Sequence, residues 1–296
     1  MGANAITGVT RQAAREASLG RARRELRLGL ILPREHGAWG LLLVPLITGA
    51  GVGFHASPRI LPALLLLTAA LALFWLRTPV ESLLGTSALR AQTRGERRTV
   101  ACAIAGLAAV AALALGALLW AGRNRDLWLI GSVAGIAFVA QALLKRRGRS
   151  FRMLSEMVGT VGLTSAAPAA YYVVTGKFGA AAWMLWLANF AFAGDQIHYV
   201  QLRIHTAHVE GLRAKFARGW TFALGQVAMA AVLVCACLGG VMPWAALGAF
   251  VPILFRGWFY FFQKPGPLVI RRLGWNELAL AVSFCALFIA GFAMAR

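Results

Sequence analysis

The residues of this chain that could do chemistry are concentrated near the end of one apolar stretch, residues 187–211. This stretch contains Asp195, one of only two aspartates in the sequence, and it continues with His198, Tyr199, Gln201 and Arg203. Ionisable groups inside a membrane segment are costly, and they usually face the interior of a helix bundle or a cavity. We therefore interpret Asp195 and the polar groups that follow it as a candidate site.

Other polar groups stand at the ends of further apolar stretches. They are Arg34, Glu35, His36, Arg77, Glu81, Glu156, Arg256, Asn276 and Glu277. The topology described below places all of them on the cytoplasmic side, so we expect them to converge on one cytoplasm-facing polar cavity. For single arginines such as Arg203 and Arg256, the alternative is that the side chain extends to the lipid headgroups.

The composition indicates a polytopic, all-α membrane protein. Of 296 residues, 59% are hydrophobic and only 14% are charged, whereas a soluble domain has about 25% charged residues. Apolar runs of about twenty residues, the length that crosses a bilayer core, recur along the chain. The net charge of +20 does not indicate nucleic-acid binding, because the basic residues lie in short segments between these runs.

The apolar stretches predict nine transmembrane helices behind a basic arm. The arm is residues 1–33, and the transmembrane domain is residues 34–296, with apolar stretches at 36–54, 58–76, 99–120, 127–144, 153–175, 180–201, 217–239, 242–262 and 274–295. Of the 30 Lys and Arg residues, 25 lie on the side of the N-terminus and 5 on the opposite side. Because basic loops stay in the cytoplasm, the N-terminus is predicted to be cytoplasmic and the C-terminus extracytoplasmic.

Glycine and proline mark positions of close packing and of helix distortion. The segments Gly49-Ala50-Gly51-Val52-Gly53 and Gly159-Thr160-Val161-Gly162 favour close contact between helices. Pro168 is expected to kink the fifth stretch or to open its packing. Neither glycine segment precedes a strand or carries the Lys-Ser/Thr of a phosphate-binding loop, so nucleotide binding is not indicated.

The start of the first stretch resembles a known family. Leu32-Pro33-Arg34-Glu35-His36-Gly37-Ala38-Trp39-Gly40, followed by Val44-Pro45, closely resembles the signature of the YwiC-like family of bacterial integral membrane proteins. This implies a location in the bacterial inner membrane. The layout of nine helices, a cytoplasmic N-terminus and polar loops after helices two and six is similar to the UbiA-type prenyltransferase superfamily.

The second resemblance implies a phosphorylated prenyl lipid as substrate, held through magnesium by two aspartate-rich motifs. Asp195 matches the first aspartate of the second motif, which implies a role as metal ligand, while Tyr199 stands where the second aspartate is expected. The region of the first motif contains no aspartate, but it contains Glu81 and five arginines. Asp195, Tyr199 and Glu81 are thus the implied catalytic residues.

Arginine side chains could replace part of the missing metal site. Arg77, Arg90 and Arg94 could bind phosphate directly through bidentate hydrogen bonds. With them we place the remaining polar side chains as substrate-binding candidates: Arg34, Glu35, His36, Glu156, His198, Gln201 and Arg203. The sequence then predicts a membrane protein that binds a phosphorylated lipid, with or without transferase activity.

Two other functions remain open on the sequence. The ionisable side chains of Glu35, Asp195 and His198 could relay protons in a transporter or exporter. His36 and His198 could bind haem iron, or the chain could be a quinone-linked partner in respiration.

Overall fold

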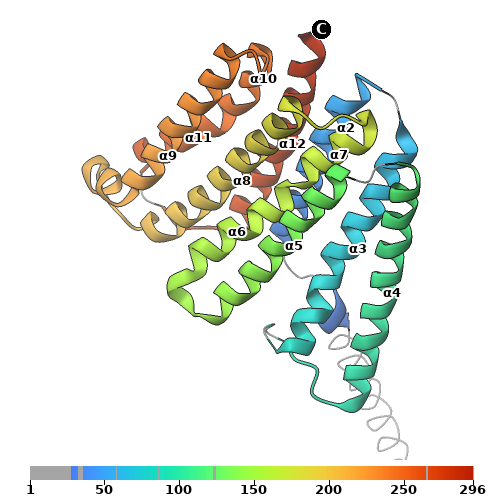
Figure 1. Cartoon of the computed structure of the whole chain (residues 1–296). Helices are drawn as coiled ribbons and strands as arrows, with labels where there is room; N and C mark the ends of the chain where they lie inside the picture. The colour runs from blue at the N-terminus through green and yellow to red at the C-terminus, as the bar shows by residue number, and fades with distance from the viewer. Residues whose placement is uncertain are drawn as a thin grey trace, which may run out of the picture. The chain divides into compact units, whose positions relative to one another are not determined.

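The computed structural model describes residues 28–32, 36–57, 59–85, 87, 89–122, 125–264 and 266–295, with the backbone alone at residues 36–38 and 149. All regular secondary structure in these ranges is helical (Figure 1). The elements are α2 (His36–Phe54), α3 (Ile60–Leu84), α4 (Arg94–Trp120), α5 (Arg125–Arg146), η1 (Arg149–Phe151), α6 (Arg152–Thr164), α7 (Ala166–Thr175), α8 (Ala180–Thr206), α9 (Leu212–Leu238), α10 (Trp244–Leu247), η2 (Gly248–Phe250), α11 (Val251–Phe262) and α12 (Ile270–Met294).

Each of the nine predicted stretches coincides with a helix or with consecutive helices. The main differences are extensions at polar ends: α3 continues to Leu84, α4 begins at Arg94 and α8 continues to Thr206. Hydropathy ends a predicted stretch at its first charged residues, but backbone hydrogen bonding continues through them. The all-α prediction is therefore confirmed for the described residues.

In the described part of the chain, seven helical segments are long and apolar enough to cross a membrane. They are Ile60–Leu84, Arg94–Trp120, Arg125–Arg146, Arg152–Thr175, Leu212–Leu238, Trp244–Phe262 and Ile270–Met294. Two predicted spans are not among them: α2 is fully described only over Trp39–Phe54, and polar residues lower the mean hydropathy of α8. The chain is a multi-pass membrane protein.

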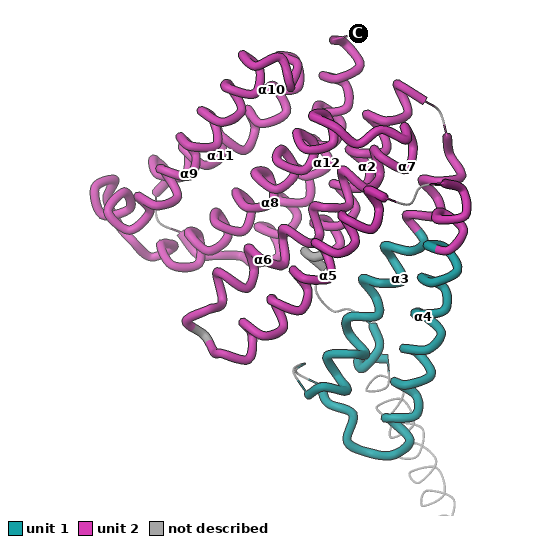
Figure 2. The backbone as a smooth tube through the Cα atoms, in the orientation of Figure 1, with its two compact units in different colours: residues 1–35, 68–115 teal, residues 36–67, 116–296 magenta. Residues whose placement is uncertain are grey.

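The chain forms two compact units, shown in different colours in Figure 2. The first unit comprises residues 1–35 and 68–115, and the second comprises residues 36–67 and 116–296. In the described part of the first unit, Leu30, Ala91 and Val100 form a small apolar core, and the Ser82 hydroxyl donates to the carbonyl of Leu30 at 3.1 Å. Of the predicted arm, only residues 28–32 are described, so the arm stays a prediction.

The second unit is organised around α8, which packs against α6, α7, α9 and α11. On one side α2 packs closely on α7, where an added Cβ at Gly49 would lie 2.1 Å from the carbonyl oxygen of Ala167. Only glycine permits this approach, which confirms the predicted close packing at Gly49. On the other side α11 contacts both α8 and α12.

The predicted distortion near Pro168 is present. The fifth stretch is divided into α6, which ends at Thr164, and α7, which begins at Ala166. Proline has no backbone N–H to donate to the carbonyl four residues earlier. The indole N–H of Trp186 on α8 lies beside the break, 3.3 Å from the carbonyl oxygen of Val161 and 3.2 Å from the hydroxyl oxygen of Thr164.

Candidate functional site

The last turns of α8 place Asp195, Tyr199 and Arg203 on one face, because residues four apart lie one turn above one another. Asp195 and Tyr199 are buried, and Arg203 is half-buried. The guanidinium of Arg203 donates to the hydroxyl oxygen of Tyr199 at 3.4 Å. Their burial agrees with the prediction that polar side chains of this segment face the interior of the helix bundle.

Arg256 of α11 joins this face to α12. Its Nη2 donates to Oδ2 of Asp195 at 2.5 Å, and its Nη1 donates to the carboxylate of Glu277. The guanidinium carbon also lies 3.9 Å from the ring centroid of Tyr199, a cation–π geometry. The side chain is only 12% exposed, so it turns inward instead of extending to the lipid headgroups.

Two glutamine amides support the cluster, one at the carboxylate of Asp195 and one at the backbone of Glu277. Gln226 of α9 donates to Oδ1 of Asp195, and Gln196 of α8 donates to the backbone carbonyl of Glu277 at 2.9 Å. Gln226 can approach because residue 257 is glycine: a Cβ there would lie 2.8 Å from its amide nitrogen. Both carboxylate oxygens of Asp195 are therefore engaged by protein donors.

Tyr260 organises the neighbouring part of the site. Two cations lie near its ring, with Arg203 at 4.8 Å and Lys215 at 4.9 Å from the centroid. Its hydroxyl shares a 2.7 Å hydrogen bond with Thr206. The buried ammonium of Lys215 donates to the backbone carbonyl of Gln263 at 2.5 Å.

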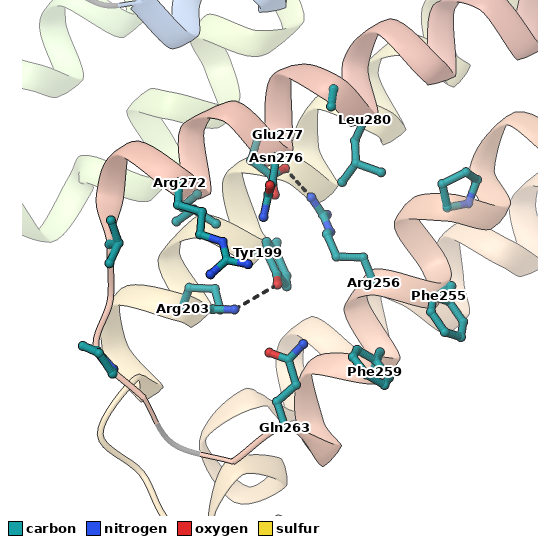
Figure 3. A pocket seen from close by; sticks show the side chains of 15 residues that line it. Tyr199, Arg203, Phe255, Arg256, Phe259, Gln263, Arg272, Asn276, Glu277 and Leu280 are labelled. Atoms are coloured by element: carbon teal, nitrogen blue, oxygen red, sulfur yellow. Dashed lines mark hydrogen bonds and ion pairs between the residues drawn. The ribbon is translucent and has the colours of Figure 1, made fainter.

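A cavity of about 700 Å³ opens beside these groups, between α8, α11 and α12 (Figure 3). Its polar lining comprises Tyr199, Arg203, Arg256, Gln263, Arg272, Asn276 and Glu277. Its apolar lining comprises Pro252, Phe255, Phe259, Pro267, Val269, Leu273, Ala279 and Leu280. The cavity thus presents a charged side and an apolar side within the second unit.

The arginines that line the cavity differ in whether they have a carboxylate partner. Arg256 is paired with Asp195 and Glu277, whereas neither Arg203 nor Arg272 has a carboxylate partner in the described part of the chain. Four buried polar atoms of the cluster also find no hydrogen-bond partner among the described residues: Arg203 Nε, Arg256 Nε, Gln226 Oε1 and Glu277 Oε1. Buried polar atoms without partners are rare in folded proteins and indicate a place for a polar ligand or for water.

Other predicted site residues of the second unit lie outside the cavity lining. Glu156 of α6 pairs with Arg152 at 2.9 Å and accepts a hydrogen bond from Gln201 of α8 at 3.3 Å. His198 points to α9, where its Nε2 lies 3.4 Å from the hydroxyl oxygen of Thr221. These contacts join neighbouring helices, and their proposed roles in binding remain predictions.

The candidates of the first unit are described by themselves. Arg77 and Glu81 form an ion pair at 3.0 Å within α3, which is the local pairing that their spacing permits. Arg90 and Arg94 are exposed. Arg34 and Glu35 lie outside the described residues, as does the side chain of His36 at the start of the second unit.

Several residues of the site were not singled out from the sequence. They are Gln196, Lys215, Gln226, Tyr260, Gln263 and Arg272. Gln226 carried a usable signal, because it is an amide within the apolar part of its stretch. Tyr260 lies in an aromatic run, and the others lie near polar residues towards helix ends, where hydropathy does not separate buried from exposed side chains.

Comparison with protein families finds a match over part of the chain. The sequence model of a family described as YwiC-like protein matches residues 32–171, and this confirms the resemblance seen at residues 32–45. No curated protein and no solved structure matches the chain significantly. The matched segment ends in α7, so all residues that line the cavity lie beyond it.

Proposed function

We propose that this chain, whose residues 32–171 match the YwiC-like family, binds a phosphorylated amphiphile in the cavity between α8, α11 and α12. The proposal narrows the predicted phosphorylated-lipid site to groups that line one cavity. Prenyl lipids are included among the candidate ligands, because the layout of the chain resembles the UbiA-type prenyltransferases.

The observation that supports this proposal most is the presence of Arg203 and Arg272, without carboxylate partners in the described residues, beside an apolar wall. A guanidinium group binds phosphate through paired N–H donors and keeps its charge when it is partly buried. The amide side chains of Gln263 and Asn276 supply further donors on the same side.

The apolar wall accounts for the tail. Phe255 and Phe259 of α11 are 66% and 50% exposed and stack with ring centroids 5.5 Å apart. In a membrane protein such exposed rings face lipid, so a hydrocarbon chain can pass from the bilayer along α11 while its headgroup reaches the arginines. The volume of about 700 Å³ is within the range of pockets that enclose a small ligand.

We further propose nine membrane crossings in a bacterial inner membrane, with the N-terminus in the cytoplasm. The distribution of Lys and Arg, 25 against 5 on alternate sides, supports this orientation. It puts the ends of α8 and α11 and the start of α12, and hence the charged side of the cavity, on the cytoplasmic side. In a transferase reaction at this site, the C–O bond of a prenyl phosphate would break, an acceptor would take the prenyl group and release a proton, and the arginines would neutralise the phosphate that leaves.

Native mass spectrometry of the full chain, purified in a neutral maltoside detergent, tests the binding proposal. We expect a retained amphiphile that carries phosphate, and we expect Arg203→Gln and Arg272→Gln each to reduce its retention about tenfold, since a charge-assisted hydrogen bond contributes about 1.5–3 kcal/mol. Arg271→Gln is the matched control, because Arg271 and Arg272 are both exposed on α12 and, of the two, Arg272 lines the cavity. An empty protein, or equal retention in all three variants, contradicts the proposal.

A further inference from the structure

The resemblance to prenyltransferases implies that magnesium joins the carboxylate of Asp195 to the phosphate of the ligand. Magnesium is a hard cation that binds carboxylate and water oxygens and dehydrates reluctantly. A carboxylate that serves it must therefore present a free oxygen to the cavity. Asp195 and Glu277 are the acidic side chains of the cluster, and their surroundings decide whether they fit this role.

The surroundings do not fit a magnesium ion. Oδ2 of Asp195 accepts from Arg256 at 2.5 Å and Oδ1 accepts from Gln226, and the side chain is only 5% exposed and does not line the cavity. Glu277 lines the cavity, but its Oε2 is paired with Arg256, and its Oε1, which has no hydrogen-bond partner in the described part of the chain, is itself buried. In addition, the described residues contain no group of three or more His, Cys, Asp or Glu side chains placed to hold a metal ion.

We infer that the cavity binds a phosphomonoester without metal, through Arg203 and Arg272, and that Asp195 and Glu277 are counter-ions that position Arg256. This inference rests on the proposed function, because it concerns how the same cavity recognises phosphate. Arg256 is held on two sides by carboxylates from α8 and α12 and lies on the ring of Tyr199. It keeps the three helices in register, so that the two arginines without carboxylate partners face the cavity.

The charge of the ligand follows from the cations around the cavity. Asp195, Glu277 and Arg256 together carry one net negative charge. Arg203, Arg272 and Lys215 carry three positive charges, and Lys215 lies with Arg203 at the ring of Tyr260, so two positive charges of this cluster remain unbalanced. A phosphomonoester carries a charge of about −1.5 to −2 at neutral pH. The phosphodiester of an ordinary membrane phospholipid carries a single negative charge. In a partly buried site the ligand that balances the charge is favoured, because uncompensated charge is costly there.

A pair of single-chain probes tests the charge requirement on the unaltered protein. We expect dodecyl phosphate to bind about tenfold more tightly than its methyl ester, which has the same tail and one charge fewer. We also expect dodecyl phosphate to bind equally in EDTA and in magnesium, as measured by native mass spectrometry of the full chain. Binding of dodecyl phosphate that requires magnesium, or equal affinity for the two probes, overturns the inference and leaves the proposed function standing. Failure of both probes and of any phosphorylated lipid to bind overturns the proposed function itself.

Asp195→Asn distinguishes a counter-ion from a metal ligand by the sign of its effect. If Asp195 held magnesium, the variant would lose affinity for dodecyl phosphate. As a counter-ion, its removal takes away a negative charge beside the cavity, so the affinity should stay the same or rise several-fold, and the preference over the methyl ester should be kept. Loss of that preference overturns the inference. Where this variant does not fold, the comparison of EDTA and magnesium on the unaltered chain still separates the two roles.

Discussion

Two regions of the second unit bury polar side chains in opposite ways. In the hydroxyl region, which comprises Thr48, Thr160, Thr164, Ser165 and Asn189, every side chain is uncharged and bonds to a carbonyl of its own helix or of the turn before it. In the charged region, which comprises Asp195, Arg203, Gln226, Arg256 and Glu277, the bonds of the two carboxylates and of Arg256 run between helices.

The difference indicates separate roles for the two regions. None of the side chains in the hydroxyl region has an unpartnered buried atom, whereas four such atoms belong to the charged region. A helix whose polar groups are satisfied locally can pack against another helix as an apolar surface does, as α2 does on α7. A cluster whose polar groups depend on other helices, and which still has atoms to satisfy, is suited to receive a ligand.

The largest effect that this comparison predicts is that of Arg256→Gln. It leaves Asp195 and Glu277 buried without their shared cation, and we expect a loss of about 3–5 kcal/mol in the free energy of unfolding. Unfolding in mixed dodecyl sulfate and maltoside micelles measures this loss. The triple variant Asp195→Asn, Arg256→Gln, Glu277→Gln removes all three charges and should recover most of the stability. A single variant as stable as the wild type would show that the triad is not a stabilising unit.

The next largest effect is expected at the close contact between α2 and α7, which lies beside the hydroxyl region. Gly49→Ala places a Cβ against the backbone of Ala167, which cannot move aside as a side chain can. We expect a loss of about 1–3 kcal/mol, measured by the same unfolding assay. Gly40→Ala is the matched control on α2, because nothing lies within 4 Å of a Cβ at that position. Similar stabilities for the two variants would mean that the α2–α7 contact is looser than the structure shows.

Hydropathy predicted the helices and the depth of their polar groups, but not which helices are neighbours. The sequence placed Asp195, Arg256 and Glu277 near one membrane depth, and the structure joins the three in one ion-pair cluster. It could not show that Gln226 occupies one oxygen of Asp195, because that bond depends on how α9 is rotated against α8. For the same reason, the sequence could not show that Asp195, which resembled a metal ligand, pairs with Arg256.

The smallest predicted effect is that of a hydroxyl inside the apolar packing. Thr48 Oγ1 lies 2.9 Å from the carbonyl oxygen of Val44 and 3.0 Å from Oδ1 of Asn189 on α8, and its one hydrogen can be donated to either. Thr48→Val keeps the shape of the side chain and removes that donor. Hydrogen bonds between membrane helices contribute about 0.6 kcal/mol on average. We therefore expect Thr48→Val to lower the free energy of unfolding by about this amount, far less than Arg256→Gln does in the same assay.

The double variant Thr48→Val, Asn189→Leu shows whether the two side chains act as a pair. If the Thr48 hydroxyl donates mainly to Val44, its loss should add independently to that of the Asn189 amide; if it donates to Asn189, the double variant should lose less than the two single losses together. Because neither side chain is charged, both outcomes should stay far below the loss expected for Arg256→Gln. A loss at Thr48 as large as that at Arg256 would contradict the division into a locally satisfied region and a region that depends on partners from other helices.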